Sequence, residues 1–156
     1  MIKKGYLRIE LDAFGNKFNV TQSAGCDKSP FYRFFSVEEL ATFRLIDSRL
    51  QGHPTTHEGL PGVRIASGSL GQGLSVAIGT AQAKKLNKDS HMVYALMGDG
   101  ELQEGQNWEA IMYAAAKKVD NLIATVDLNG KQIDGSTDKV LPMGSVEGKF
   151  KAFGWE

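Results

Sequence analysis

The sequence lacks a second cysteine, a long apolar run and a net charge. Because Cys26 is the only cysteine among 156 residues, no internal disulfide can form, and we expect a reducing compartment, by default the cytoplasm. No apolar run is long enough to span a bilayer, and residues 1–15 lack the continuous apolar stretch of a signal peptide. Lysine plus arginine number 18, as do aspartate plus glutamate. We therefore predict no nucleic-acid or membrane partner, while the near-zero charge favours self-association.

What is present is the pattern of a globular α/β domain. Apolar residues make up 42% of the chain and charged residues 23%, which excludes wholesale disorder. Periodic apolar residues predict helices over 36–50, 69–86 and 107–119, with a further one starting between 144 and 155, and buried strands over 91–97 and 121–128. The strand–helix–strand order between 91 and 128 is a βαβ unit. We therefore expect an α/β fold with a parallel sheet flanked by helices.

Glycine is concentrated in two clusters, residues 59–73 and 98–105. The first cluster leads into the expected helix 69–86, whose small residues leave one face with little side-chain bulk. Because glycine costs about 1 kcal/mol in a helix relative to alanine, such a helix needs very close packing or a ligand against its backbone. Residues 1–35 show only partial strand-like alternation, and we assign no structure to them.

One polar residue follows each of the two predicted strands, and these two residues are candidate metal ligands. Asp99 ends the first strand and Asn129 follows the second, 30 positions later (129 − 99). Ligands of parallel α/β sheets bind at the carboxyl ends of the strands, so we expect these side chains to lie together. Carboxylate and amide oxygens suit magnesium, which often bridges to a diphosphate, and Gly98 and Gly100 allow close approach of the backbone. The residues thus predict a magnesium–diphosphate cradle.

Other interpretations of the same residues are weaker. Gly-Asp-Gly or Leu-Asn-Gly alone is typical of a surface turn, but here both follow predicted buried strands one βαβ unit apart. Residues 68–73 do not have the spacing of a dinucleotide-binding fingerprint, and the chain contains no Walker motif. His53 and His57 are four apart, as in a helical zinc pair, but Pro54 and the surrounding glycines argue against a helix there.

The ordered motifs resemble the thiamine-diphosphate-binding domain of transketolase. They are "LQGHPTTHEGLPGVRIASGSLGQGLSVAIG", "GDGELQEGQNWEA" and "VDLNGKQIDGSTD", and the likeness runs from about residue 36 to the end. It is greatest for the N-terminal subunit of two-chain transketolases. The resemblance implies a thiamine-diphosphate-binding fold in residues 36–156, present as a partial domain that is incomplete at its C-terminal end, with residues 1–35 outside it.

The resemblance also implies which residues hold the metal ion. The side chains of Asp99 and Asn129, with the backbone carbonyl of Lys131, would ligate Mg²⁺. Gly100 would approach the diphosphate of thiamine diphosphate. Asp99 and Asn129 are thus predicted as metal ligands both by the residue pattern and by the resemblance, whereas Lys131 is predicted by the resemblance alone.

Further residues match positions around the rest of the cofactor. Gly68, Ser69 and Leu70 correspond to a stretch that lies along thiamine diphosphate. His53 matches a histidine near the reactive carbon and the donor sugar. Glu104 matches an acidic residue in the network that links two cofactor sites across a dimer. These assignments predict His53 and Glu104 as the catalytic residues.

The activity implied is transfer of a two-carbon ketol unit from a ketose phosphate to an aldose phosphate, as in the pentose phosphate pathway. The family's cofactor-activating glutamate lies on a pyrimidine domain that nothing here matches. We therefore expect a C-terminal partner subunit, a homo- or hetero-oligomer, and inactivity of the chain alone. Residues 1–35 also lack the family's histidines, and the family's domain continues past a segment like residues 153–155.

Two alternatives remain open at this stage. The chain could be a truncated, catalytically inactive transketolase-like fragment that self-associates. It could also belong with pyruvate dehydrogenase E1, which shares the cofactor turn, although "GELQEG" and "QIDGSTDKV" fit transketolase better.

Overall fold

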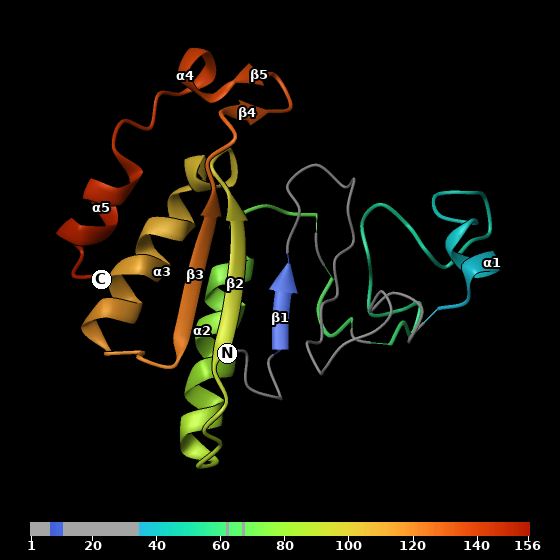
Figure 1. The fold of residues 1–156 in the computed structure, drawn as a ribbon, viewed down its shortest axis with the longest axis horizontal. Helices are drawn as coiled ribbons and strands as arrows, with labels where there is room; N and C mark the ends of the chain where they lie inside the picture. The colour runs from blue at the N-terminus through green and yellow to red at the C-terminus, as the bar shows by residue number, and fades with distance from the viewer. Residues whose placement is uncertain (1–6, 11–34, 62, 67) are drawn as a thin grey trace.

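The computed structural model describes residues 7–10, 35–61, 63–66 and 68–156 (Figure 1). The elements in these ranges are β1 (Leu7–Glu10), α1 (Val37–Leu40), α2 (Gly73–Leu86), β2 (Val93–Gly98), the 3-10 helix η2 (Glu101–Gln103), α3 (Gly105–Ala116), β3 (Leu122–Asp127), β4 (Lys131–Gln132), β5 (Gly135–Ser136), α4 (Thr137–Val140) and α5 (Val146–Ala152). None of the described helices combines the length and apolar character needed to cross a membrane.

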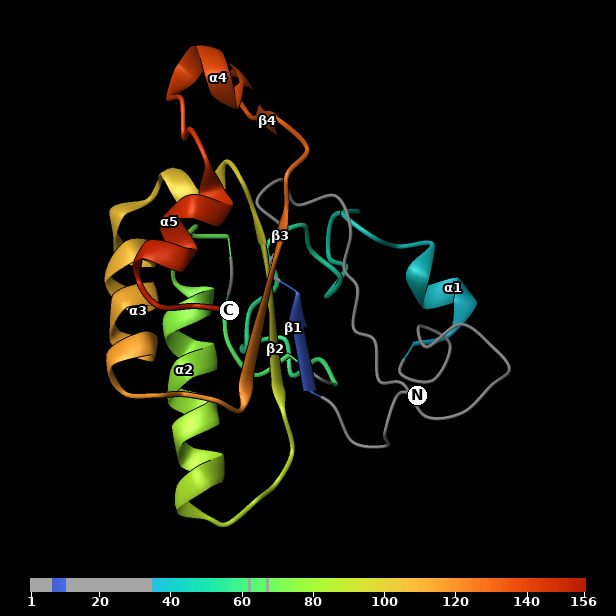
Figure 2. The same cartoon turned by 60° about the vertical axis from the view of Figure 1, so that its left-hand side comes forward.

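A parallel sheet in the order β1-β2-β3 forms the centre of the described structure. In the register of β2 and β3, Val93 faces Leu122 and Gly98 faces Asp127, so both strands end at the same edge. Helices α2 and α3 lie on one side of the sheet (Figure 2), and α5 lies beside α3 (Figure 1). The predicted α/β fold with a parallel βαβ unit is therefore confirmed.

The main core lies between the sheet and helices α2 and α3. Its fully buried side chains include Leu74, Val93, Met97, Leu102 and Ile111. On α2, Ala77 and Ala81 are also fully buried, and these small residues allow the helix to pack closely. Gly79 lies on the exposed side, where nothing would meet an added Cβ within 4 Å. Close packing thus accounts for the alanines of this helix, whereas Gly79 has no such role.

The C-terminal helix α5 confirms the helix expected between residues 144 and 155. The Ser145 hydroxyl accepts a hydrogen bond from the Gly148 amide at 2.9 Å and caps the first turn. Trp108 on α3 packs edge-to-face on Phe150, with ring centres 6.1 Å apart. The Trp155 indole donates to the Ile111 carbonyl at 2.9 Å. Aromatic packing and this hydrogen bond therefore hold residues 145–155 against α3.

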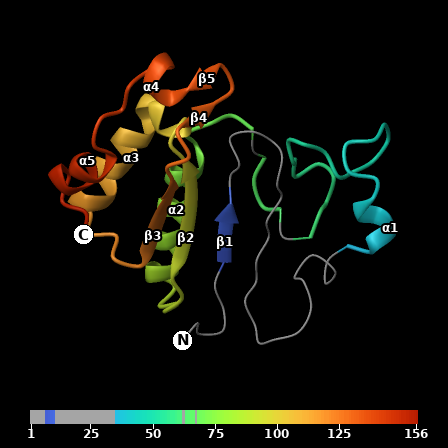
Figure 3. The ribbon, with the colours of Figure 1, turned by 45° about the horizontal axis from the view of Figure 1, so that its top comes forward.

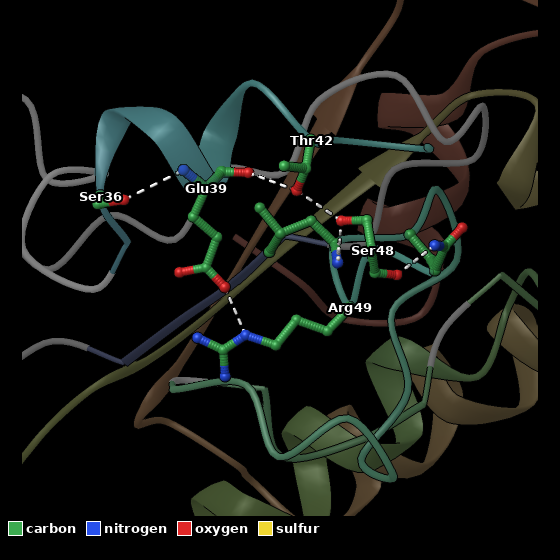
Figure 4. A network of polar contacts seen from close by, with 7 residues as sticks. Ser36, Glu39, Thr42, Ser48 and Arg49 are labelled. Atoms are coloured by element: carbon green, nitrogen blue, oxygen red, sulfur yellow. Dashed lines mark hydrogen bonds and ion pairs between the residues drawn. The ribbon is translucent and has the colours of Figure 1, made fainter. Parts of the chain in front are cut away.

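The helix predicted over residues 36–50 was wrong in its length, since α1 ends at Leu40. Its start is as expected, because the Ser36 hydroxyl accepts a hydrogen bond from the Glu39 amide at 3.1 Å. The Thr42 hydroxyl then donates to the Glu39 carbonyl at 2.7 Å and also contacts the Ser48 hydroxyl (Figure 4). Such side-chain bonds compete with helical ones, and Arg44 has a φ of 64°. The chain therefore turns instead of continuing the helix.

The other predicted elements differ from the observed ones mainly at their ends. The helix expected over 69–86 begins at Gly73, so residues 69–72 form a loop. The helix expected over 107–119 runs from Gly105 to Ala116. Alternate residues of β3 are exposed, which shows that this strand is less covered than its apolar run predicted.

Candidate functional site

The buried carboxylate of Asp99 is the centre of the candidate site. Asp99 follows β2 and is 5% exposed. Its Oδ1 accepts a hydrogen bond from the Gly100 amide at 2.9 Å, and its Oδ2 accepts from the Gly130 amide at 2.8 Å and the Thr137 hydroxyl at 3.4 Å. Within the described ranges no lysine or arginine forms an ion pair with Asp99. The Oδ1 oxygen keeps a lone pair for a further contact, so the buried charge suits a bound cation.

The loop after β3 lies against this turn, as the strand register requires. The Asp99 amide donates to the Asp127 carbonyl at 3.1 Å. A Cβ added to Gly100 would lie 3.4 Å from the Lys131 carbonyl oxygen and 2.7 Å from the Gln132 Cβ. Gly100 therefore permits the approach of the two segments, and the Lys131 carbonyl stands beside the Asp99 turn. Figure 3 shows β4 close to the end of β2.

Asn129 lies in the same loop but its side chain is engaged locally. Its Oδ1 accepts a hydrogen bond from the Lys131 amide at 2.9 Å, and its Nδ2 donates to the Asp127 carboxylate at 3.3 Å. The side chain is exposed, and its oxygen keeps a second lone pair. The structure thus brings the Asn129 loop to Asp99 through Gly130, whose amide makes the direct contact.

The donor set matches the chemistry of magnesium. In the described part of the chain, no three side chains of histidine, cysteine, aspartate and glutamate gather as a metal cage. The oxygens near the turn come instead from one buried carboxylate, a backbone carbonyl and an exposed amide. Magnesium takes few protein ligands and keeps several waters or phosphate oxygens, so this mixed oxygen set fits it.

Gly68, Ser69 and Leu70 form a loop that meets His53. Gly68 has a φ of 121°, and a Cβ there would lie 2.6 Å from the His53 Nδ1. The imidazole therefore lies directly against the Gly68 backbone, with both residues exposed. The Ser69 hydroxyl accepts from the Gln72 amide nitrogen at 3.0 Å. Two motifs that are 15 positions apart (68 − 53) thus come together.

Glu104 lies beside the end of the same loop. A Cβ added to Gly71 would lie 2.8 Å from the Glu104 Cβ and 2.9 Å from the Gln106 Nε2. The Glu104 side chain is exposed, and the Gln106 amide donates to the Leu70 carbonyl at 2.9 Å. The predicted residues therefore form two groups, one at Asp99 and one at Gly68–Leu70, with Glu104 close to the second.

Sequence reasoning missed the buried polar residues that join these groups. The Glu101 Oε1 accepts from the Gly71 amide at 2.9 Å, and the Asn107 side chain donates to the Glu101 carbonyl at 2.7 Å. Burial raises the pKa of the Glu101 carboxyl, and the bond from Gly71 partly opposes this. A signal for Asn107 existed, since it shares its helix face with Ala110 and Ile111 and is therefore a polar residue among apolar ones.

Fold and site together define an α/β domain with an oxygen-rich turn at the carboxyl ends of parallel strands. Comparison with known proteins shows that the chain belongs to the transketolase family, because residues 31–156 match the transketolase thiamine diphosphate binding domain. The predicted family and the thiamine-diphosphate-binding fold are therefore confirmed.

Several relatives of this chain are named as transketolase subunits. The chain is 43% identical over 123 residues to a subunit of the apulose-4-phosphate transketolase of Phocaeicola vulgatus, covering 79% of this chain and 43% of the relative. It is 40% identical over 122 residues to the 6-deoxy-6-sulfo-D-fructose transketolase subunit SqwG of a Clostridium species, covering 78% and 44%. The chain thus spans less than half the length of these relatives.

A solved structure gives the same result for the fold. The transketolase of Campylobacter jejuni superposes with a TM-score of 0.69 at 38% identity. The match covers 78% of this chain and 20% of that one. The described architecture therefore corresponds to about one fifth of a full-length transketolase.

Proposed function

We propose that this chain binds thiamine diphosphate through a magnesium ion at the Asp99 turn. The observation that carries the proposal is the buried Asp99 carboxylate, which has only neutral donors among the described residues and stands next to Gly100 and the Lys131 carbonyl. Its desolvation is costly, and a divalent cation offsets that cost. Membership of a thiamine-diphosphate-binding family supports the choice of ligand.

The residues at the turn have separable tasks in this proposal. Asp99, the Lys131 carbonyl and the Asn129 amide oxygen hold the magnesium ion. Gly100 keeps the backbone free of side-chain bulk next to the diphosphate. Thiamine diphosphate, when bound, supplies the nucleophilic carbon and the electron sink of the reaction. The chain's own contribution is to hold and orient that group.

The loop residues complete the proposed site. Gly68, Ser69 and Leu70 would contact the cofactor. His53, whose ring lies against Gly68, would serve its reacting end. Glu104 connects this site to a second one across an oligomer. The proximity of His53 to Gly68 supports placing both in one site, since contact over 15 positions fixes the ring beside the loop.

We further propose that the complete enzyme transfers a two-carbon ketol unit from a ketose phosphate to an aldose phosphate. The names of the relatives, which are transketolase subunits, support an enzyme assembled from two chains. The second chain would supply the pyrimidine domain and its activating glutamate. In this proposal the enzyme is cytoplasmic, and the chain is inactive alone and acts within an oligomer.

Calorimetric titration tests the binding step, and reconstitution tests the reaction. The chain is titrated with thiamine diphosphate, with and without magnesium chloride, first alone and then co-purified with a pyrimidine-domain subunit from the same genome. We expect saturable, magnesium-dependent heat in the complex, and ketol transfer only there. No heat in either setting, with the helical circular dichroism intact, would contradict the proposal. Self-association of such a folded, non-binding chain in light scattering would favour an inactive fragment instead.

A further inference from the structure

The acidic side chain of Glu101 connects the two halves of the candidate site. Glu101 begins η2, two positions after Asp99, and is 1% exposed. Its Oε1 accepts the Gly71 amide hydrogen at 2.9 Å, although the two residues are 30 positions apart. Gly71 itself has a φ of 84°, which favours glycine. A buried acidic side chain therefore fixes the end of the Gly68–Leu70 loop.

The backbone at Glu101 is also held by hydrogen bonds. The fully buried Asn107 on α3 donates to the Glu101 carbonyl at 2.7 Å, and the Trp108 indole donates to the Leu102 carbonyl at 2.9 Å. The backbone of Glu101 is thus bonded to α3, while its carboxylate contacts the loop. The loop is consequently held in place relative to the turn that carries Asp99.

A purely structural role explains this arrangement less well. The Asn107 Oδ1 is buried and has no hydrogen-bond partner among the described residues, and the Glu101 Oε2 is buried with no side-chain partner there. Burying such acceptors destabilises the protein, and an apolar side chain of similar size would fill the same space without that cost. Retaining an acid here is understandable if the position of the Gly71 amide matters.

We propose that Glu101 is a positioning residue, which holds the Gly68–Gly71 loop at a fixed distance from the Asp99 turn so that both can contact one diphosphate-bearing ligand. The inference rests on the proposed function for the identity of that ligand. The tether between Glu101 and Gly71 is a property of the ligand-free chain and can be tested without it.

Hydrogen–deuterium exchange of the ligand-free chain tests the tether directly. In the wild type we expect the Gly71 amide to be protected, because its hydrogen is donated to a buried oxygen. In Glu101→Ala, exchange in residues 69–73 should become about tenfold faster or more, while β2 and β3 keep their protection. Glu101→Gln keeps an acceptor oxygen and should restore most of the protection.

Two matched variants make the test specific. Gln106→Ala removes the exposed tether to the Leu70 carbonyl and should accelerate exchange in residues 69–73 less than Glu101→Ala does. Glu147→Gln removes an acid from an exposed ion pair on α5 and should leave this loop unchanged. Equal acceleration by Glu101→Ala and Glu147→Gln, or an unprotected Gly71 amide in the wild type, overturns the proposal. If Glu101→Ala fails to fold, protection of the Gly71 amide in the wild type and in Glu101→Gln remains the test.

Binding of thiamine diphosphate with magnesium is the second readout. Positioning by Glu101 predicts that Glu101→Ala weakens binding about tenfold or more and that Glu101→Gln stays close to the wild type. Unchanged affinity in Glu101→Ala, despite a deprotected loop, would contradict a role of the tether in ligand binding. A wild type that binds no thiamine diphosphate would refute the proposed function. The exchange experiment would still test the tether between Glu101 and Gly71, because it uses the ligand-free chain.

Discussion

Residues 35–66 and residues 68–156 are stabilised in different ways. The C-terminal region has a large apolar cluster between the sheet and its helices, whereas the described part of the earlier region has a buried cluster of Phe35, Leu50 and Leu60. Polar contacts supplement that small cluster, among them the ion pair of Arg49 with Glu39 (Figure 4). Exposed polar contacts each contribute little to stability. We therefore expect His53 to lie in the less stable region and Asp99 in the more stable one.

The difference shows how the candidate site is divided between a rigid and a less rigid part. The Asp99 turn follows directly from a core strand, so its geometry is set by the sheet register. The His53 segment instead contacts the loop at Gly68. Segments with few buried apolar contacts open locally at lower free energy. We therefore expect the Asp99 turn to be formed before any ligand arrives, and the His53 segment to gain stability when one binds.

The largest expected effect separates the two apolar clusters. Ile111→Ala removes a fully buried side chain from the main core and should lower the free energy of unfolding by about 2–5 kcal/mol. Leu60→Ala should cost clearly less, because the described part of its cluster has few buried residues. Urea denaturation followed by circular dichroism measures both. A Leu60→Ala variant as destabilised as Ile111→Ala would show that the two regions form one cooperative unit.

The contact between the regions is tested by two glycine substitutions. Gly68→Ala places a Cβ at a φ of 121° and 2.6 Å from the His53 ring, so it should destabilise by about 1–3 kcal/mol and displace the ring. Gly79→Ala on the open side of α2 should instead stabilise by up to about 1 kcal/mol. Thermal unfolding gives the sign of each effect, and the imidazole NMR signals report the ring. Unchanged His53 signals in Gly68→Ala would argue against the contact.

The smallest effect concerns a surface ion pair within the more stable region. Lys84 contacts Asp89 at 2.6 Å and, with the His91 amide, lowers the pKa of the Asp89 carboxyl. Because the folded-state pKa is lowered, this contribution to stability is complete above the unfolded-state pKa of about 4 and is lost as the pH falls below it. Asp89→Asn should therefore show a shallower loss of stability between pH 5 and about 2 in denaturant titrations. Identical slopes would show that the pair contributes nothing.

Sequence periodicity predicted the C-terminal region well because its elements are long and apolar on one face. The observed β3, Leu122–Asp127, falls inside the predicted range 121–128, and the resulting register placed Asp99 next to the loop of Asn129. In the earlier region the same reasoning failed, since the hydroxyls of Thr42 and Ser48 capture backbone groups that a helix needs. Local competition of this kind is not visible in apolar spacing.

The polar connections of the site were less predictable than its centre. Asp99 carries a recognisable turn motif, but the burial of Glu101 depends on a loop 30 positions earlier in the chain. Thr137, which donates to Asp99, lies 38 positions after it. Such long-range pairs follow from the tertiary fold and not from spacing along the chain. The sequence therefore indicated which ligand chemistry to expect, and the structure was needed to find what holds the site together.

Magnesium-dependent binding of thiamine diphosphate to Asp99→Ala, measured beside Asp134→Ala, tests the central claim most directly. Both changes remove one negative charge, but Asp134 is exposed whereas Asp99 is the buried acid of the turn. In calorimetry of the partner-completed protein, we expect Asp99→Ala to lose the saturable, magnesium-dependent heat and Asp134→Ala to keep it. A folded Asp99→Ala that binds thiamine diphosphate and magnesium as the wild type does would contradict the assignment of Asp99 as the metal ligand.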